Sequence, residues 1–207
     1  MYRGSGLILR TIPYSDSAKI LQCFTQNKGL ISLFVRQASK KRMTGHLQSG
    51  SFIEFTAKQR SNTSILSMTD ARWDPRVPTD ALAGEQSALW FFTLELLQKS
   101  IKENLPIPRL FNRIRLYYAM LSQNDVQLIP LVPLLVISTE LGLSDLKLIA
   151  SMSGRDLVEI LNRLGYDAEI GSDRQHQMTI EELFHLERDR FMDQFNIDAL
   201  ETLYLLE

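Results

Sequence analysis

Cysteine and histidine are scarce in this sequence, and their scarcity argues against two common kinds of site. The single cysteine, Cys23, has no second thiol with which to form an internal disulfide, so the fold is not built on a disulfide framework. The three histidines are scattered and none stands near that cysteine, so no four-ligand zinc set is expected. Because the first residues also lack the apolar core of a signal peptide, we expect a cytoplasmic protein.

Long apolar runs and catalytic motifs are also missing. The most apolar stretch, residues 128–137, contains two prolines and is about half as long as the roughly 20 residues of a membrane-spanning helix, so it predicts a buried helix instead. No Walker loop, zinc-protease motif or nucleophile elbow is present. Gly4-Ser5-Gly6 precedes a predicted strand and is interpreted as a flexible lead-in. We therefore expect no enzymatic activity, no cofactor and no metal.

The charge is divided unevenly along the chain, although it nearly cancels overall. Residues 1–76 carry 12 Lys and Arg against 4 Asp and Glu, whereas residues 77–207 carry 11 against 20. The two parts therefore have net charges of +8 and −9. An asymmetry of this kind indicates that the basic part binds a polyanion. A solvated basic surface without a ligand is the alternative.

Short runs of β-branched and aromatic residues, separated by turn-forming residues, predict five strands in the first 76 residues. Asn27-Lys28-Gly29 suits a tight hairpin, since Asn and Gly tolerate positive φ at the least cost. Closing the strands into a small barrel removes the exposed edges that an open sheet would have. The strands are expected near Leu7–Ile12, Lys19–Gln26, Leu30–Gln37, Ser51–Arg60 and Ser64–Trp73.

The pattern becomes helical after Pro75 and Pro78, which end the last predicted strand. Apolar residues at i, i+3 and i+4 predict helices over residues 79–102, 106–122 and 128–141. The sequence therefore predicts an α+β protein with an amino-terminal five-stranded β-barrel and an all-α remainder.

The last sixty residues contain three candidate helix starts. Ser144, Ser153 and Thr179 are residues of the type that caps helix amino termini, and Glu182 completes a capping box with Thr179. The domain boundary is expected between residues 76 and 77.

Basic residues are concentrated between the third and fourth predicted strands, in a stretch without acidic residues from position 28 to position 51. Each phosphate that such side chains neutralise releases counterions, which gives affinity without reading the sequence. Phe52 shares strand parity with Glu54 and Lys58, so its ring is expected to face outward, where it could stack on a base. Packing inside the barrel is the alternative.

A series of short motifs near the amino terminus keeps the order and spacing of a known family. The motifs are Gly6-Leu7-Ile8-Leu9-Arg10-Thr11, Tyr14-Ser15-Asp16, Lys19-Ile20-Leu21, Phe24-Thr25 and Gly29-Leu30-Ile31-Ser32. This pattern resembles the bacterial recombination mediator RecO. The likeness extends over residues 4–75 and is only general over residues 79–142.

The resemblance implies an OB-fold barrel that binds single- and double-stranded DNA, joined to a helical domain. It implies a non-enzymatic mediator of DNA repair and recombination that anneals complementary strands. With RecR, such a mediator helps to load RecA onto DNA coated with single-strand-binding protein, whose acidic, Phe-ending tail docks on the helical domain. Many RecO proteins carry a four-cysteine zinc module there, and this chain has no cysteine after Cys23, so residues 77–207 are expected to lack it.

We assign DNA binding to basic residues of the predicted barrel, namely Arg10, Lys19, Arg36, Lys40, Lys41, Arg42, Lys58 and Arg60. For the tail of single-strand-binding protein we assign Arg109 and Arg113 beside Phe111, because an acidic, apolar-ended peptide needs cations next to an apolar pocket. Surface arginines over a core stripe are the alternative. For the whole protein, the alternative is a non-enzymatic adaptor whose basic barrel binds acidic protein surfaces. We expect it in the cytoplasm, associated with the nucleoid.

Overall fold

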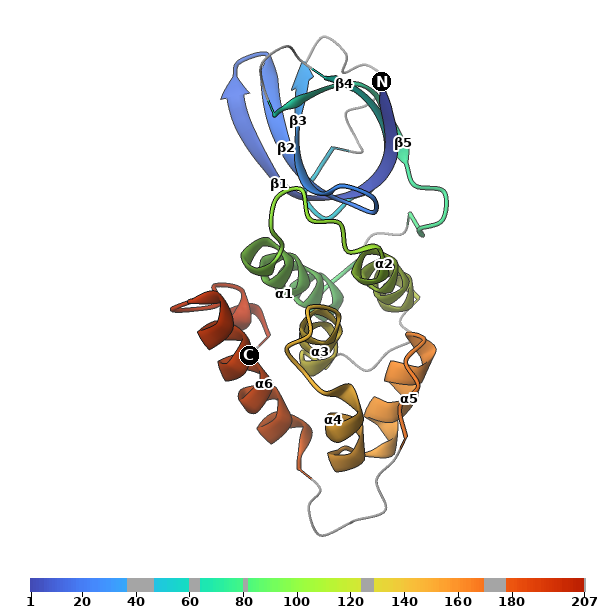
Figure 1. Cartoon of the computed structure of the whole chain (residues 1–207), viewed down its shortest axis with the longest axis vertical. Coiled ribbons are helices and arrows are strands. Elements are labelled where there is room, and N and C mark those ends of the chain that lie inside the picture. Colours follow the sequence, from blue (N-terminus) through green and yellow to red (C-terminus); the bar gives the residue numbers. More distant parts are fainter. Residues whose placement is uncertain (37–46, 60–63, 80–81, 124–128, 170–177, 207) are drawn as a thin grey trace. The chain divides into compact units, whose positions relative to one another are not determined.

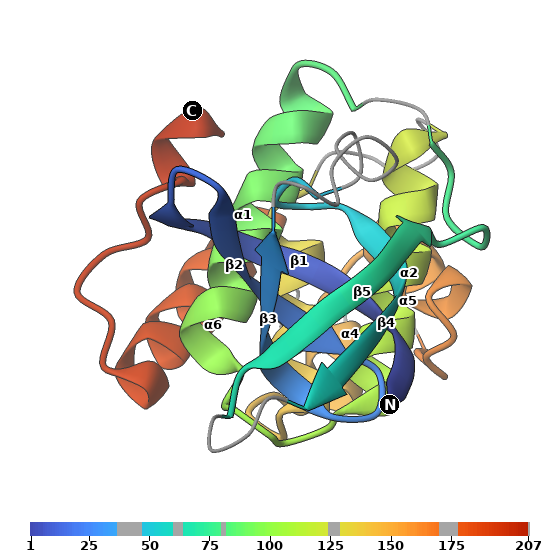
Figure 2. The same ribbon diagram turned by 90° about the horizontal axis from the view of Figure 1, so that it is seen from above.

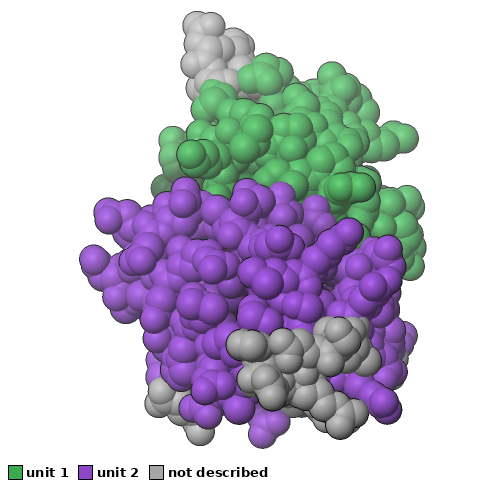
Figure 3. All heavy atoms as spheres, turned by 60° about the horizontal axis from the view of Figure 1, so that its bottom comes forward, with its two compact units in different colours: residues 1–80, 100–115 green, residues 81–99, 116–207 purple. Residues whose placement is uncertain are grey.

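The computed structural model describes residues 1–36, 47–59, 64–79, 82–123, 129–169 and 178–206. Contacts divide the chain into two compact units, which Figure 3 shows in green and purple. Unit 1 comprises Met1–Asp80 and Ser100–Arg115, and unit 2 comprises Ala81–Lys99 and Leu116–Glu207. The segment Ser100–Arg115 thus packs with the amino-terminal residues although a helix separates it from them in sequence.

Unit 1 contains a closed five-stranded barrel in the order β1-β2-β3-β5-β4 (Figure 1). Neighbouring strands pair antiparallel except β3 and β5, which run parallel; Figure 2 shows β5 between β3 and β4. This is the topology of an OB-fold, and the expected fold class is confirmed. The strands are β1 (Tyr2–Ser15), β2 (Ala18–Thr25), β3 (Gly29–Arg36), β4 (Phe52–Gln59) and β5 (Leu66–Trp73).

Alternating side chains of the five strands fill the barrel interior. Cys23 is fully buried among them, and burial raises the pKa of its thiol well above the usual range, so it acts as a small apolar residue, as its alternation with Leu21 predicts. The interior residues include Ile8, Leu21, Cys23, Ile31, Leu33, Val35, Ile53, Phe55, Ala57, Leu66, Met68 and Ala71.

Strand β1 begins five residues earlier than predicted. Gly4-Ser5-Gly6 is not a flexible lead-in but part of β1, and it pairs with Phe55, Glu54 and Ile53 of β4. A Cβ on Gly6 would overlap Cys23 Sγ, so glycine is what lets β1 lie this close to β2. The prediction that the strand starts at Leu7 failed because the two glycines have a low β-propensity. In the fold, pairing of β1 with β2 and β4 stabilises this part of the strand.

The segment Ser100–Arg115 closes one side of the barrel within unit 1. Gly29 adopts a φ of 67° in the β2–β3 hairpin, as the turn sequence predicts, and the backbone of Leu105 occupies the space of a side chain there. The amide of Asn104 donates to the carbonyl of Leu30 at 3.2 Å. The first half of α2 (Pro108–Ser122) then places Phe111 edge-on to two rings of the barrel.

Those two rings are Phe24 and Phe52, whose centroids lie 5.6 Å and 6.0 Å from that of Phe111. Phe52 is buried, so the expectation that its ring is available to a base is wrong. Its strand parity was assigned correctly, but the outer surface at this point is covered by α2. Burial of three phenyl rings explains why the segment belongs to unit 1.

All regular secondary structure among the described residues of unit 2 is helical. Its central helix, α3 (Leu131–Glu140), is buried from Leu131 to Ser138, which confirms the buried helix predicted from the apolar run. Contacts join it to α5 and α6. The other helical elements are α1 (Glu85–Ser100), the second half of α2, α4 (Leu146–Met152), α5 (Arg155–Arg163), α6 (Ile180–Phe195) and the 3₁₀ turn η4 (Leu203–Leu205).

The predicted helix starts are correct in one case of three. Thr179 caps α6 and forms the expected capping box with Glu182. The cap of α4 is Asp145 rather than Ser144, and the cap of α5 is Gly154 rather than Ser153. Both serines have other partners, because the hydroxyl of Ser144 donates to the buried carboxylate of Glu187 and that of Ser153 donates to backbone carbonyls at the end of α4.

Candidate nucleic-acid interface

The outer surface of β1, β2 and β3 carries basic charge and half-buried apolar side chains. Strand register places Arg10 opposite Gln22, which lies opposite Ser32, and directly opposed residues share one face of a sheet. The next row is Ile12, Ile20 and Phe34. The third row ends at Arg36, opposite Ala18. We call this surface the β1–β2–β3 face, made of Arg10, Ile12, Tyr14, Ile20, Gln22, Ser32, Phe34 and Arg36.

Two bulges in β1 determine which of its side chains point outward. The pairing with β2 passes from Ile8 to Arg10 and from Pro13 to Ser15 while β2 advances by one residue each time, so Leu9 and Tyr14 are the extra residues. A bulge of this kind re-aims the side chains that follow it. The first bulge brings Arg10 to the outside of the barrel. At the second bulge, no residue of β2 lies directly opposite Tyr14.

Acidic residues are absent from all three strands of this face, and the one carboxylate of the connecting hairpin is the exposed Asp16. Arg10 and Arg36 are exposed and make no ion pair with any residue that the structure describes. The face therefore keeps a net positive charge that an anion can reach. These two predicted DNA-binding residues lie at its two ends.

The remaining predicted DNA-binding residues are placed differently. Lys19 is half-buried at the barrel rim, where its Nζ donates to the carbonyl of Leu47 at 2.8 Å. Lys58 is exposed on β4, in a row that runs through Ser67 of β5 to Phe34, and therefore extends the same surface around the barrel. Lys40, Lys41, Arg42 and Arg60 lie outside the described residues.

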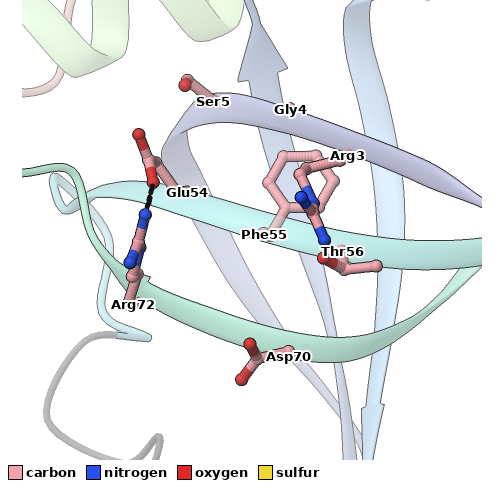
Figure 4. A pocket seen from close by; sticks show the side chains of 8 residues that line it. All are labelled: Arg3, Gly4, Ser5, Glu54, Phe55, Thr56, Asp70 and Arg72. Carbon is pink, nitrogen blue, oxygen red and sulfur yellow. Dashed lines mark hydrogen bonds and ion pairs between the residues drawn. The ribbon is translucent and has the colours of Figure 1, made fainter.

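The outer surface of β4, β5 and the first half of β1 has a different electrostatic character. It forms a pocket in which two carboxylates, Glu54 and Asp70, alternate with basic and hydroxyl side chains (Figure 4). Arg72 donates from Nε and Nη2 to one oxygen of Glu54 at 2.9 Å and 2.6 Å. We call this surface the β4–β5 face, lined by Arg3, Gly4, Ser5, Glu54, Phe55, Thr56, Asp70 and Arg72.

A buried carboxylate neutralises another arginine beside the β4–β5 face. Asp74 is buried and accepts hydrogen bonds from Arg76 Nε and Nη2, each at 2.7 Å. Burial alone would raise the pKa of Asp74, but the hydrogen bonds and the charge of Arg76 outweigh it and hold that pKa below its ordinary value. Arg76 also donates to Ser5 Oγ at 2.7 Å. Two arginines here are thus committed to internal ion pairs.

The three residues predicted to bind the peptide tail do not form one surface. Phe111 is fully buried in unit 1 against Phe24 and Phe52, so its ring offers no pocket to a peptide. Arg109 is exposed and Arg113 is half-buried, four residues apart on α2. This arrangement matches the alternative of arginines beside a core stripe, since the apolar side of α2 is already occupied.

In the sequence, Tyr14 is one of four aromatic residues among the basic positions of the barrel, and each of them could either contact nucleic acid or pack inside the barrel. The segment Pro13-Tyr14-Ser15-Asp16-Ser17 was predicted to be a strand break, whereas its first three residues belong to β1. The exposed aromatic ring of Tyr14 is recognisable as part of a face only when the bulge and the neighbouring strands are known.

Within the described residues, no group of three or more His, Cys, Asp and Glu side chains is arranged to hold a metal ion. No described helix has the length and apolarity needed to cross a bilayer.

Comparison with known proteins identifies the barrel. Residues 1–73 match the family described as "Recombination protein O N terminal". Over these residues the barrel is similar to the N-terminal domain of RecO. The resemblance that the strand motifs carry is therefore confirmed, and it covers the barrel with both faces described above.

Similar full proteins are named DNA repair protein RecO. The chain is 30% identical over 104 residues to the protein of Bacteroides fragilis. It is 24% identical over 107 residues to that of Exiguobacterium sp. and 24% identical over 125 residues to that of Laribacter hongkongensis. The matches cover 47%, 52% and 60% of this chain and 42%, 43% and 51% of the relatives. The chain thus spans about half the length of the curated relatives it matches.

Proposed function

We propose that this protein acts in DNA repair and recombination by binding single- and double-stranded DNA through its barrel, without sequence specificity and without catalytic turnover. The observation that carries the proposal is the one-sided charge of the barrel. Arg10 and Arg36 lie on a face whose strands contain no carboxylate, whereas Arg72 and Arg76 are engaged by Glu54 and Asp74. Phosphates gain most from cations that are not already paired.

The position of this face within the fold supports the same proposal. OB-folds bind oligonucleotides on the surface of strands 2 and 3 and with the adjoining loops. The segment that carries Lys40, Lys41 and Arg42 follows Arg36 directly in the chain. The half-buried Ile12 and Ile20 beside the arginines suit nucleotides better than a free phosphate ion, because bases supply apolar surface.

The proposed role includes strand annealing and RecA loading. We propose that the protein pairs complementary strands and, together with RecR, helps RecA to displace single-strand-binding protein. The names of the relatives support a role in DNA repair. A face that binds the phosphate backbone and leaves base edges unread suits the pairing of any two complementary sequences.

Binding at two salt concentrations tests the proposal. Unrelated single-stranded oligonucleotides and their duplexes should bind at 50 mM salt and lose affinity steeply at 200 mM, with little difference between sequences. An annealing assay with complementary strands, with and without single-strand-binding protein and RecR, tests the second part. Absence of DNA binding at low salt would contradict the proposal and favour an adaptor that binds acidic protein surfaces.

For the acidic tail of single-strand-binding protein, we propose a contact with Arg109 and Arg113. Both arginines lie on α2, and Arg109 is exposed. Replacing both with Ala should weaken binding of an acidic, Phe-ending peptide while leaving DNA affinity unchanged. Phe111 is left intact in this test, because its ring stabilises unit 1. Unchanged peptide affinity in the double variant would show that the tail binds elsewhere.

A further inference from the structure

One aromatic side chain stands out on the surface of the barrel. Tyr14 is 65% exposed, although burying a ring of this size is normally favourable. It is the extra residue of the second β1 bulge. Its ring meets that of Phe34 edge-on, with centroids 5.6 Å apart and an interplanar angle of 86°. Contact with the buried Phe34 holds one edge of the ring, so its orientation is restricted while its surface remains accessible.

The surroundings of Tyr14 indicate what kind of molecule would cover it. Ile12 and Ile20 continue the apolar row from Phe34, and Arg36 lies at the neighbouring end of β3. An apolar row next to unpaired arginines complements a ligand that has flat apolar surfaces and regularly spaced negative charge. A nucleic-acid strand has both.

We infer that Tyr14 is a base-stacking residue and that the β1–β2–β3 face is built for single strands in particular. The inference rests on the proposed function and adds the class of DNA. In a duplex, both surfaces of an internal base are stacked on its neighbours, so the Tyr14 ring has nothing to stack on. In a single strand the bases can be splayed and stacked on a protein ring. The arginines contact phosphate in either form, and the ring distinguishes the two.

The test compares four variants with the wild-type chain on a single-stranded oligonucleotide and on a blunt duplex of the same length. Tyr14→Ala removes the ring, Tyr14→Leu keeps apolar contact with Phe34 but not the flat surface, and Tyr14→Phe keeps the ring. Tyr204→Ala is the matched control, because Tyr204 is 71% exposed and belongs to unit 2. Urea unfolding of each variant verifies that the barrel is folded.

Tyr14→Ala and Tyr14→Leu should each weaken single-strand binding about 5- to 150-fold, the range measured for losing one stacked base. Duplex binding should change less than about 2-fold, and Tyr14→Phe and Tyr204→Ala should behave as wild type. The slope of affinity against salt should stay the same, because no phosphate contact is lost.

Three results would overturn the inference. Equal losses on single strand and duplex would show a general effect on the barrel surface. Wild-type affinity in Tyr14→Ala would show that the ring touches no base, while the proposed function survived. A wild-type chain that binds neither form of DNA would overturn the proposed function as well, so the two failures are distinguishable.

Discussion

Replacement of Phe111 by Ala should strongly destabilise unit 1. The side chain is fully buried and meets Phe24 and Phe52 edge-on. Removing a buried phenyl ring costs about 3–5 kcal/mol, including the cavity it leaves, and each edge-on ring pair contributes about 0.5–1.5 kcal/mol of such a loss. With a urea m-value of about 2 kcal/mol/M, the unfolding midpoint should fall by about 1.5–2.5 M.

The two tryptophans allow this to be measured for unit 1 alone. Trp73 lies in unit 1 and Trp90 in unit 2, so a Trp90→Phe background leaves Trp73 as the fluorescent reporter of the barrel. Phe91→Ala is the control for loss of a phenyl ring, because Phe91 is 48% exposed and its loss should shift the midpoint far less. A shift below about 0.5 M for Phe111→Ala would refute the packing of α2 on the barrel.

Three further changes test individual contacts. Gly6→Ala should destabilise unit 1 by about 1–3 kcal/mol, because the new Cβ overlaps Cys23 Sγ. In urea titrations, adding Cys23→Ala to the same chain should recover part of that loss. If the destabilisation caused by the two changes were fully additive, the close approach of Gly6 and Cys23 would be contradicted. Asp74→Asn should cost about 1–3 kcal/mol near pH 7, since it breaks the hydrogen bonds from Arg76. The folded-state pKa of Asp74 is lowered, so this stability is present above pH ~4 and is lost as the pH falls through that pKa. A difference from wild type that does not shrink as the pH is lowered would be inconsistent. Thr179→Ala should lower the helical stability of unit 2 by about 1 kcal/mol in thermal unfolding followed by circular dichroism, and an unchanged midpoint would argue against the cap.

Much of the barrel could be predicted from the sequence because its strands are β-rich and end at turn residues. The glycine of the β2–β3 hairpin, Gly29, was identified from turn chemistry alone. The start of β1 was missed because Gly4 and Gly6 are poor strand formers that pairing with β2 and β4 holds in place. Helix caps were missed by one residue at Ser144, where the side chain of Asp145 caps α4, and at Ser153, which caps the end of α4 while Gly154 caps the start of α5.

The candidate site was harder to predict, because it depends on neighbours that are distant in sequence. Counting charges identified the basic part of the chain. It did not show that Arg72 is paired with Glu54, whereas Arg10, on the β1–β2–β3 face, has no ion pair among the described residues. Strand parity placed Phe52 outside, yet a segment sixty residues later covers it with Phe111. The exposure of Tyr14 follows from a bulge, for which the sequence gives no signal.

The central claim is that DNA binds the β1–β2–β3 face and not the β4–β5 face. Arg3 provides a matched control for Arg10, because both are exposed arginines of β1 without an ion pair among the described residues. Arg10 belongs to the β1–β2–β3 face and Arg3 to the β4–β5 face. The most direct measurement is the salt dependence of single-strand affinity for Arg10→Gln/Arg36→Gln and for Arg3→Gln. For the double variant we predict a slope of log affinity against log salt that is shallower by about 1.4, at roughly 0.7 per lost phosphate contact. For Arg3→Gln we predict an unchanged slope. A shallower slope for Arg3→Gln together with an unchanged slope for the double variant would contradict the central claim.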